Sequence, residues 1–272
     1  MNSRPLVRYH GGKWKLAPWI ITHFPNHRVY CEPFGGGGSV LLRKPRSAAE
    51  VYNDLDGEIA NLFRVARDAG EALALRCELT PFARSELVLA YQASADPLEQ
   101  ARRTLVRSFM GFGSAAASGQ TTGFRSNSNR SGTTPAHDWM NYPDALRMTI
   151  QRLRGVVIEN RDAMACMRQH DAPTTLHYVD PPYVHSTRSL RTRAPAYRHE
   201  LDDGQHGELI AGLRSLVGMV VVSGYRSDLY DELFSDWRRV DVPAHADGAR
   251  ARVESLWLSP SCRVQYDLLE AA

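Results

Sequence analysis

Seven short apolar runs with strand character recur along the chain, and helical patterns lie between the later ones. The runs are RVYCEPF (28–34), AEVYND (49–54), GVVIEN (155–160), TLHYVD (175–180), GMVVVSG (218–224), RRVDVPA (238–244) and VESLWLS (253–259). In the stretch GQHGELIAGLRSLVG, apolar residues fall at helical spacing, namely Leu209, Ile210, Leu213, Leu216 and Val217. Strands that alternate with helices predict an α/β fold with a parallel, doubly wound sheet. In such folds the active groups lie at the carboxyl ends of the strands.

The alternation of strands and helices breaks in the middle of the chain. EIANLFRVARDAG, FARSELVLAYQ and PLEQARRTLVRSF have helical patterns, and a loop rich in Gly, Ser, Thr and Asn follows at 111–134. A loop of this length without structure of its own is usually functional or mobile. We therefore predict a catalytic domain formed by 1–55 and 146–272, interrupted by a helical insert at 56–145 that carries a basic recognition loop.

Positive charge is concentrated in two stretches of the chain. The composition is that of an ordinary globular protein, with 43% hydrophobic and 23% charged residues and a net charge of +3. Five arginines and no acid lie at 101–137, and four arginines and no acid lie at 183–199. These stretches suggest an anionic partner. The alternative is a solvated basic face, because the chain has only three lysines and uses arginine as its general cation.

Several classes of protein are disfavoured. No run approaches 18 apolar residues and the N-terminus lacks an apolar signal segment, so we expect a cytoplasmic protein without membrane contact. The four cysteines are scattered, which predicts reduced packing thiols. HExxH is absent and the histidines form no ligand cluster, so we expect no metal site.

The segment YCEPFGGGGSVLL (30–42) combines a strand, a glycine loop and an expected helix. Glycines let a backbone pass close to a ligand, and a helix N-terminus favours a negative group. The spacing fits neither GxGxxG nor the Walker pattern. A cofactor site and a simple tight turn both remain open on this segment alone.

Acidic residues follow the ends of successive strands. Asp54 ends the second strand, where α/β folds bind ribose hydroxyls. It can instead cap the next helix, although Asp56 is better placed for that. Asp162 follows the third strand and suits an adenine amino group or another cap. Together with the glycine loop, these acids suit an adenosyl cofactor that carries an amino acid rather than a pyrophosphate.

The segment HYVDPPYVHS (177–186) places an acid, two prolines and an aromatic ring after a buried strand. Prolines hold the chain in a rigid shape there. The Asp180 carboxylate and the Pro181 carbonyl can each accept one N–H of an exocyclic amine, which aims the nitrogen lone pair at an electrophilic methyl. Tyr183 can stack on the base, which has to be flipped out of a duplex. The alternative is a strand-ending turn with a solvated Asp.

Four motifs in this order resemble the Dam-like (D12 class, alpha group) DNA N6-adenine methyltransferases, many of them phage or prophage enzymes. The motifs are RYHGGK (8–13), EPFGGGGSV (32–40), Asp54 and DPPY (180–183), with an insert before the last. The resemblance implies a Rossmann-like doubly wound methyltransferase sheet with an inserted helical target-recognition domain. It also implies S-adenosylmethionine as cofactor, double-stranded DNA as substrate and a monomer on DNA.

The resemblance also implies roles for individual residues. The catalytic residues would be Asp180, Pro181, Pro182 and Tyr183. The cofactor would be bound by Tyr9, Gly11, Gly12, Lys13, Phe34, Gly36, Gly38, Ser39, Asp54, Asp162 and Asp180. The wall of the target-base pocket would include Ser223, Gly224 and Tyr225, whereas we predict Trp257 in the core.

The two basic stretches supply the predicted DNA contacts. Arg suits guanine edges and phosphates, Asn pairs with adenine, and Phe can wedge into the base stack. The predicted contacts are Arg107, Phe124, Arg125, Asn127, Asn129, Arg130, Arg188, Arg191 and Arg193. Phe109 and Phe112 are predicted to pack at a helix end. The loop shows no recognisable signature of the GATC-specific members, so the resemblance does not assign GATC as the recognition sequence of this site-specific enzyme.

Three other functions stay open. N4-cytosine methylation uses similar chemistry, but those enzymes often carry Ser in place of the acid, so Asp180 favours adenine. An RNA adenine is a second option, although the long basic insert favours a duplex. A catalytically silent DNA-binding homologue is the third, and the intact DPPY and glycine loop argue against it.

Overall fold

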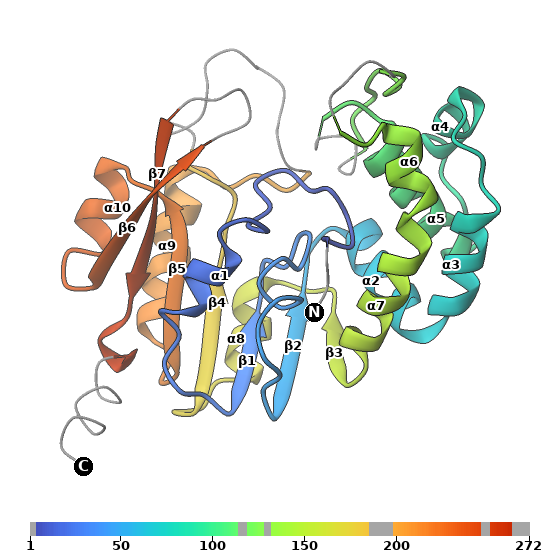
Figure 1. Ribbon diagram of the computed structural model, residues 1–272. Coiled ribbons are helices and arrows are strands. Elements are labelled where there is room, and N and C mark those ends of the chain that lie inside the picture. The colour runs from blue at the N-terminus through green and yellow to red at the C-terminus, as the bar shows by residue number, and fades with distance from the viewer. Residues whose placement is uncertain (1–3, 114–118, 128–131, 185–197, 246–250, 263–272) are drawn as a thin grey trace.

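The computed structural model describes residues 4–113, 119–127, 132–184, 198–245 and 251–262. Their centre is one seven-stranded sheet with the order β3-β2-β1-β4-β5-β7-β6 (Figure 1). The strands are β1 (Val29–Glu32), β2 (Ala49–Asn53), β3 (Val156–Glu159), β4 (Thr175–Val179), β5 (Met219–Tyr225), β6 (Arg238–His245) and β7 (Ala251–Leu258). All seven predicted strands are confirmed.

The prediction of a parallel sheet is correct for five strands and wrong for two. β3, β2, β1, β4 and β5 are parallel to one another, whereas β7 runs antiparallel to both β5 and β6. Only 246–250 separate β6 from β7, which is too short for the crossover that a parallel pair requires. β7 therefore returns directly and inserts between β5 and β6.

Two apolar clusters show that both faces of the sheet are covered. In β4, Leu176 and Tyr178 belong to one cluster and Val179 to the other, as expected when successive side chains point to opposite faces. The second cluster packs against α8 (Ala163–Gln169), α9 (Asp203–Arg214) and α10 (Asp228–Leu233). Trp257 is fully buried in it, as predicted. All four cysteines are buried free thiols, which also confirms the prediction.

The first cluster joins the sheet to α1 (Ala17–Ile21) and to the helices of the middle region. Those helices are α2 (Gly57–Asp68), α3 (Gly70–Glu78), α4 (Arg84–Ala90), α5 (Pro97–Met110), α6 (Pro135–Met140) and α7 (Tyr142–Leu153). They gather beside the β3 edge, and β6 and β7 lie at the other edge (Figure 1). Because α7 begins inside the predicted insert and ends beyond residue 145, the exact domain division stays a prediction.

Candidate functional site

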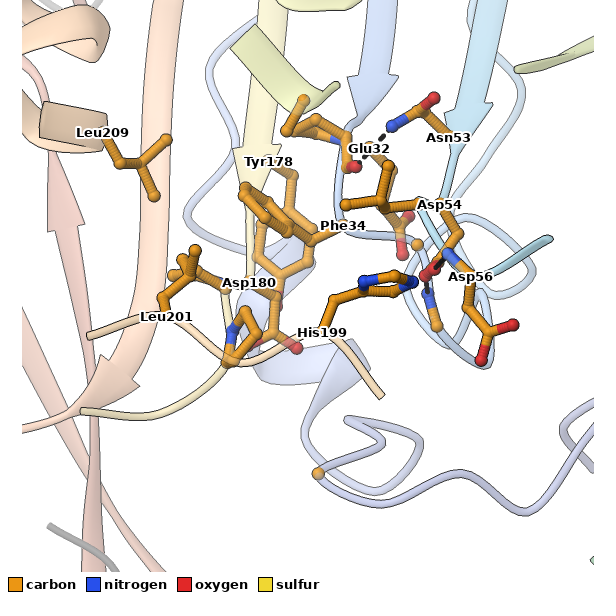
Figure 2. Close-up of a pocket in the computed structure, with 18 of the residues that line it drawn as sticks. Glu32, Phe34, Asn53, Asp54, Asp56, Tyr178, Asp180, His199, Leu201 and Leu209 are labelled. Carbon is orange, nitrogen blue, oxygen red and sulfur yellow. Dashed lines mark hydrogen bonds between the residues drawn. The ribbon is translucent and has the colours of Figure 1, made fainter. Parts of the chain in front are cut away.

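A cavity of about 420 Å³ opens at the carboxyl ends of the parallel strands. Glu32 and Phe34 reach it from the end of β1, Asp54 from the end of β2, and Asp180 from the end of β4 (Figure 2). Strand order reverses between β1 and β4, and open α/β sheets bind ligands at such a switch point. The volume is within the range of small-molecule sites.

The glycine loop forms one wall because larger residues do not fit there. Gly36 has φ +46°, and a Cβ at this position would lie 2.9 Å from the Tyr9 ring. A Cβ at Gly35 would lie 2.1 Å from the Tyr52 ring. The Gly36 amide donates a 2.7 Å hydrogen bond to Asp54. The loop backbone thus packs against the rings of Tyr9 and Tyr52 and is hydrogen-bonded to Asp54 at the end of β2.

The helix expected after this loop is not formed in the described structure. Residues 39–43 form turns instead. One physical reason is that the amide of Leu41 donates to Glu32 Oε2 at 2.9 Å rather than to a carbonyl four residues earlier. The argument that a helix N-terminus favours a negative group therefore does not apply here.

Buried Glu32 and half-buried Asp54 line the cavity. Asp54 accepts from the amides of Gly36 and Asp56, at 2.7 and 2.8 Å, and burial raises its pKa to about 6. Glu32 accepts from the Tyr30 hydroxyl at 2.7 Å, and burial raises the pKa of Glu32 to about 8. The sequence analysis missed Glu32, although a charged residue at the end of an apolar strand was a usable signal.

Two acids at helix starts act as caps. Asp56 accepts from the Glu58 amide at 2.9 Å and caps α2, as predicted. Asp162 accepts from the Ala165 amide at 2.8 Å and caps α8, and it also lines the cavity. Asp162 can therefore cap α8 and face the cavity at the same time.

The DPPY segment is held by side chains from distant parts of the chain. Asp180 Oδ1 accepts from Lys13 Nζ at 2.8 Å and from Ser223 Oγ at 2.9 Å. No residue of the described ranges donates a hydrogen bond to its other oxygen, Oδ2. Lys13 also donates to the Tyr183 hydroxyl at 2.7 Å. The lysine of the N-terminal motif thus fixes the acid and the tyrosine of DPPY together.

The Tyr183 ring stacks on Tyr225, with 4.3 Å between ring centroids and 19° between planes. Ser223 and Tyr225 come from β5, so this strand borders the DPPY segment as the resemblance implied. The Cβ of a larger residue at Gly224 would face Tyr230 and Trp257 instead.

The structure brings most of the predicted cofactor residues together. Those that line the cavity are Tyr9, Gly11, Gly12, Lys13, Phe34, Gly36, Ser39, Asp54, Asp162 and Asp180. Pro181 and Pro182 line it as well, whereas Tyr183 does not. Gly38 also lies outside the lining, and a Cβ there would meet Phe63 of α2 at 2.8 Å.

Arg198 is a lining residue that the sequence analysis did not assign. Its guanidinium pairs with Asp56 Oδ1 and Glu58 Oε1, each at 3.1 Å. These carboxylates outweigh the effect of burial and raise the pKa of Arg198. Arg198 therefore joins the segment that begins at residue 198 to the start of α2 at the cavity wall.

Arg107 does not have the surface position predicted for it. Only 3% of the residue is exposed. Its guanidinium pairs with Glu58 and donates to the Ala90 carbonyl at 2.9 Å. The prediction that Arg107 contacts DNA is wrong, because the side chain is held inside the helical region by these partners.

The start of the predicted recognition loop folds back on itself. Gly111 and Phe124 form an antiparallel bridge, and the Phe112 amide donates to the Gly123 carbonyl at 2.7 Å. The Phe124 ring lies 5.0 Å from that of Phe82. Arg125 is half-buried and donates to the Phe109 carbonyl at 2.9 Å. These bonds give the bridge a defined shape next to the end of α5.

The exposed positions of this loop differ from those expected. Phe109 is buried as predicted, but Phe112 is 72% exposed, so the prediction that it packs is wrong. Asn127 is exposed. The remaining predicted contacts, which are Asn129, Arg130, Arg188, Arg191 and Arg193, lie outside the described residues.

The described ranges contain neither a metal-binding cluster nor a membrane-spanning helix. Within the described ranges, no group of three or more His, Cys, Asp or Glu side chains is placed to hold a metal ion. No helix in those ranges has the length and apolar character needed to cross a membrane.

Comparisons with known proteins place the chain in a family. A sequence model of the D12 class N6 adenine-specific DNA methyltransferases matches residues 9–246. The chain is 25% identical over 196 residues, 68% of its length, to a DNA adenine methylase from Haemophilus influenzae. It is 35% identical over 74 residues, 27% of its length, to the type II methyltransferase M1.LlaDCHI from Lactococcus lactis subsp. cremoris. These matches span 65% and 26% of the two relatives. The match across most of the chain confirms the predicted resemblance, and the protein belongs to the D12 class N6 adenine-specific DNA methyltransferase family.

Proposed function

We propose that this protein transfers a methyl group from S-adenosylmethionine to the N6 amine of an adenine flipped out of double-stranded DNA. The observation that carries the proposal is the hydrogen bonding of the Asp180 carboxylate. Lys13 and Ser223 hold one carboxylate oxygen, and no described residue donates to the other. Family membership supports the same reaction, because methyltransferases of this family imply S-adenosylmethionine as the methyl donor.

The cavity suits that cofactor in its chemistry. S-adenosylmethionine supplies an electrophilic methyl group on a sulfonium, and it also carries ribose hydroxyls and an ammonium group. Asp54 can accept from ribose hydroxyls, and Asp162 can accept from the adenine amino group. Glu32 and Asp180 offer carboxylates to the cationic part of the molecule. The absent side chains at Gly35 and Gly36 leave room for the adjoining tyrosines and keep the loop backbone at the cavity wall.

Asp180 and Pro181 orient the target amine. Asp180 Oδ2 accepts one N–H and the Pro181 carbonyl accepts the other, so the nitrogen lone pair turns out of the ring plane toward the methyl group. Because Oδ1 is already fixed by two donors, the carboxylate is oriented before the base arrives. Such preorganisation lowers the barrier without a covalent intermediate.

Tyr183 provides a stacking surface for the flipped base. One face of its ring is covered by Tyr225 in the structure. A base that stacks on this face has to separate the two rings. The energy of unpairing and unstacking the base in DNA is then partly offset by new stacking contacts in the protein.

The bridge at the end of α5 is the proposed DNA-reading surface. Phe112 and Asn127 are exposed there, and half-buried Arg125 donates to the carbonyl of Phe109 in α5. An exposed Phe suits insertion between base steps, and Asn suits hydrogen bonding to adenine. We include Phe112 in place of Arg107.

The test is methyl transfer from radiolabelled S-adenosylmethionine to unmodified plasmid DNA, followed by digestion and nucleoside mass spectrometry. The expected product is N6-methyladenine. N4-methylcytosine would overturn the target base, and label that enters only RNA would overturn the substrate. If no nucleoside is methylated while the cofactor binds, the protein is a silent DNA-binding homologue.

A further inference from the structure

Glu254 is a buried carboxylate next to the proposed target-base site. It lies on β7 opposite Tyr225 of β5, and its side chain is only 2% exposed. Its Oε1 atom is 3.4 Å from Lys13 Nζ. The carboxylate therefore belongs to the same cluster of side chains as Asp180 and Tyr183, although it is 74 positions further along the chain than Asp180.

The bonding of Glu254 is poor for a buried charge. Oε1 is at ion-pair distance from Lys13 but accepts no hydrogen bond of good geometry from the described residues. Burial raises the pKa of Glu254 above its ordinary value, and Lys13 only partly opposes this effect. A buried carboxylate oxygen without a hydrogen bond destabilises a fold. Stability alone therefore gives no reason for an acid at this position.

Lys13 has no spare N–H for Glu254 in this arrangement. Its ammonium donates to Asp180 Oδ1 at 2.8 Å, to the Tyr183 hydroxyl at 2.7 Å and to the Gly11 carbonyl at 3.3 Å. Burial disfavours the charge on Lys13, but Asp180 and Glu254 together raise its pKa well above the ordinary value. The Lys13 ammonium thus faces two carboxylates. It donates to Asp180, and Glu254 is close enough to be an alternative acceptor.

We propose that Glu254 is a positioning residue for methyl transfer, which acts by sharing the Lys13 ammonium with Asp180. This inference rests on the function proposed above. When Asp180 accepts an N–H of the target amine, the ammonium can shift toward Glu254. Without Glu254, Lys13 would pair with Asp180 alone and neutralise it more completely. Asp180 would then be a weaker acceptor for the amine in the transition state.

The proposal predicts opposite effects on activity and stability. In Glu254→Gln, the single-turnover rate of methyl transfer should fall about tenfold or more. The reason is that Lys13 then pairs with Asp180 alone, so Asp180 becomes a weaker acceptor for the N–H of the target amine. Dissociation constants for S-adenosylmethionine and DNA should stay within about twofold of wild type. The Tm should stay the same or rise by about 2–4 °C, since an unsatisfied buried charge is removed. Glu254→Met, which is apolar and similar in length, should behave alike and serves if the amide variant does not fold.

A double-mutant cycle tests whether Glu254 acts through Lys13. In the Lys13→Gln background, Glu254→Gln should slow single turnover by no more than about twofold, because the shared ammonium is already absent. Glu50→Gln is the matched control, since Glu50 is also a buried carboxylate paired with a lysine but lies at the other end of the sheet. It should lower the Tm without slowing single turnover of the folded enzyme.

Two results would overturn the inference. One is a rate within about twofold of wild type in both Glu254 variants. The other is a rate effect that is fully retained in the Lys13→Gln background, which would show that Glu254 acts without Lys13. A wild-type enzyme that makes no N6-methyladenine would instead overturn the proposed function, so the two failures are distinguishable.

Discussion

Two buried ion clusters lie at opposite ends of the sheet, and they differ in how well their charges are satisfied. At the amino end of β2, Glu50 accepts from Lys44 at 2.8 Å and from both terminal nitrogens of Arg152 at 2.6 and 2.9 Å. At the carboxyl ends of the strands, one lysine, Lys13, faces Asp180 and Glu254. The first cluster has more cations than anions, and the second has more anions than cations.

The pKa shifts follow this difference. The pKa of Glu50 is lowered, because Arg152 and Lys44 outweigh the effect of burial. The pKa of Glu254 is raised, because burial outweighs the one distant lysine. A buried charge with every oxygen bonded can contribute to the fold, whereas one with free acceptor sites is suited to receive a ligand. The comparison thus distinguishes a structural cluster, around Glu50, from the cluster around Lys13 for which we propose a function and which is called the functional cluster below.

The largest expected effect comes from removing the acid of the functional cluster. Asp180→Ala should lower methyl transfer by about 10³-fold or more, because the oriented acceptor for the target amine is lost. Binding of duplex DNA should change little. Single-turnover rates and fluorescence anisotropy with labelled DNA measure the two properties. Turnover that survives in this variant would contradict the proposed mechanism.

The structural cluster should respond in stability rather than in chemistry. Glu50→Ala leaves Lys44 and Arg152 without their buried partner, so the free energy of unfolding should fall by about 3 kcal/mol. Urea denaturation followed by circular dichroism measures this loss. The rate of methyl transfer per folded molecule should equal that of wild type. A slower chemical step in folded Glu50→Ala would break the distinction between the two clusters.

Tyr183 belongs to both the stack and the lysine network, so two variants can separate its contributions. Tyr183→Ala removes the stacking surface and should weaken transition-state binding by ~1–3 kcal/mol. Tyr183→Phe keeps the ring and removes the hydroxyl that accepts from Lys13, so its loss in kcat/KM should be smaller. Equal losses in both variants would mean that the hydroxyl, and not the ring, carries the effect.

The position of the residues that directly follow a strand could be predicted from the sequence. Asp54 follows β2 and DPPY follows β4, and a parallel sheet brings the carboxyl ends of its strands to one edge, where Asp54 and Asp180 line the cavity. The antiparallel return of β7 and the turns after Gly38 depend on local connections and hydrogen bonds that periodicity does not encode.

Partners that are distant in sequence were not predictable in the same way. Lys13 and Asp180 are 167 positions apart, so no spacing rule links them. Arg107 was placed at the surface because its neighbours are basic, yet its acidic partner Glu58 lies 49 positions upstream and holds it inside. A basic stretch shows how much charge is present, but it does not show which arginines are paired. Glu254 left one local signal, a charge in the apolar strand VESLWLS.

Glu32 extends the comparison to cofactor binding and gives the smallest effect. Its pKa is about 8, raised by burial from an ordinary 4.5, so the folded protein holds a proton that the unfolded chain has lost. Glu32 therefore lowers the free energy of unfolding as pH rises from 4.5 to 8. A cationic cofactor in the cavity favours ionised Glu32, so its binding should release a proton below pH 8, and its affinity should rise severalfold toward that pH. Titration calorimetry in buffers of different ionisation enthalpy measures this release. Glu32→Gln should abolish it between the pKa of Asp54, about 6, and pH 8, because Asp54 is already ionised there. Binding without proton release at that pH would show that Glu32 stays neutral beside the cofactor and that its carboxyl group acts only in the structural hydrogen bonds of the fold.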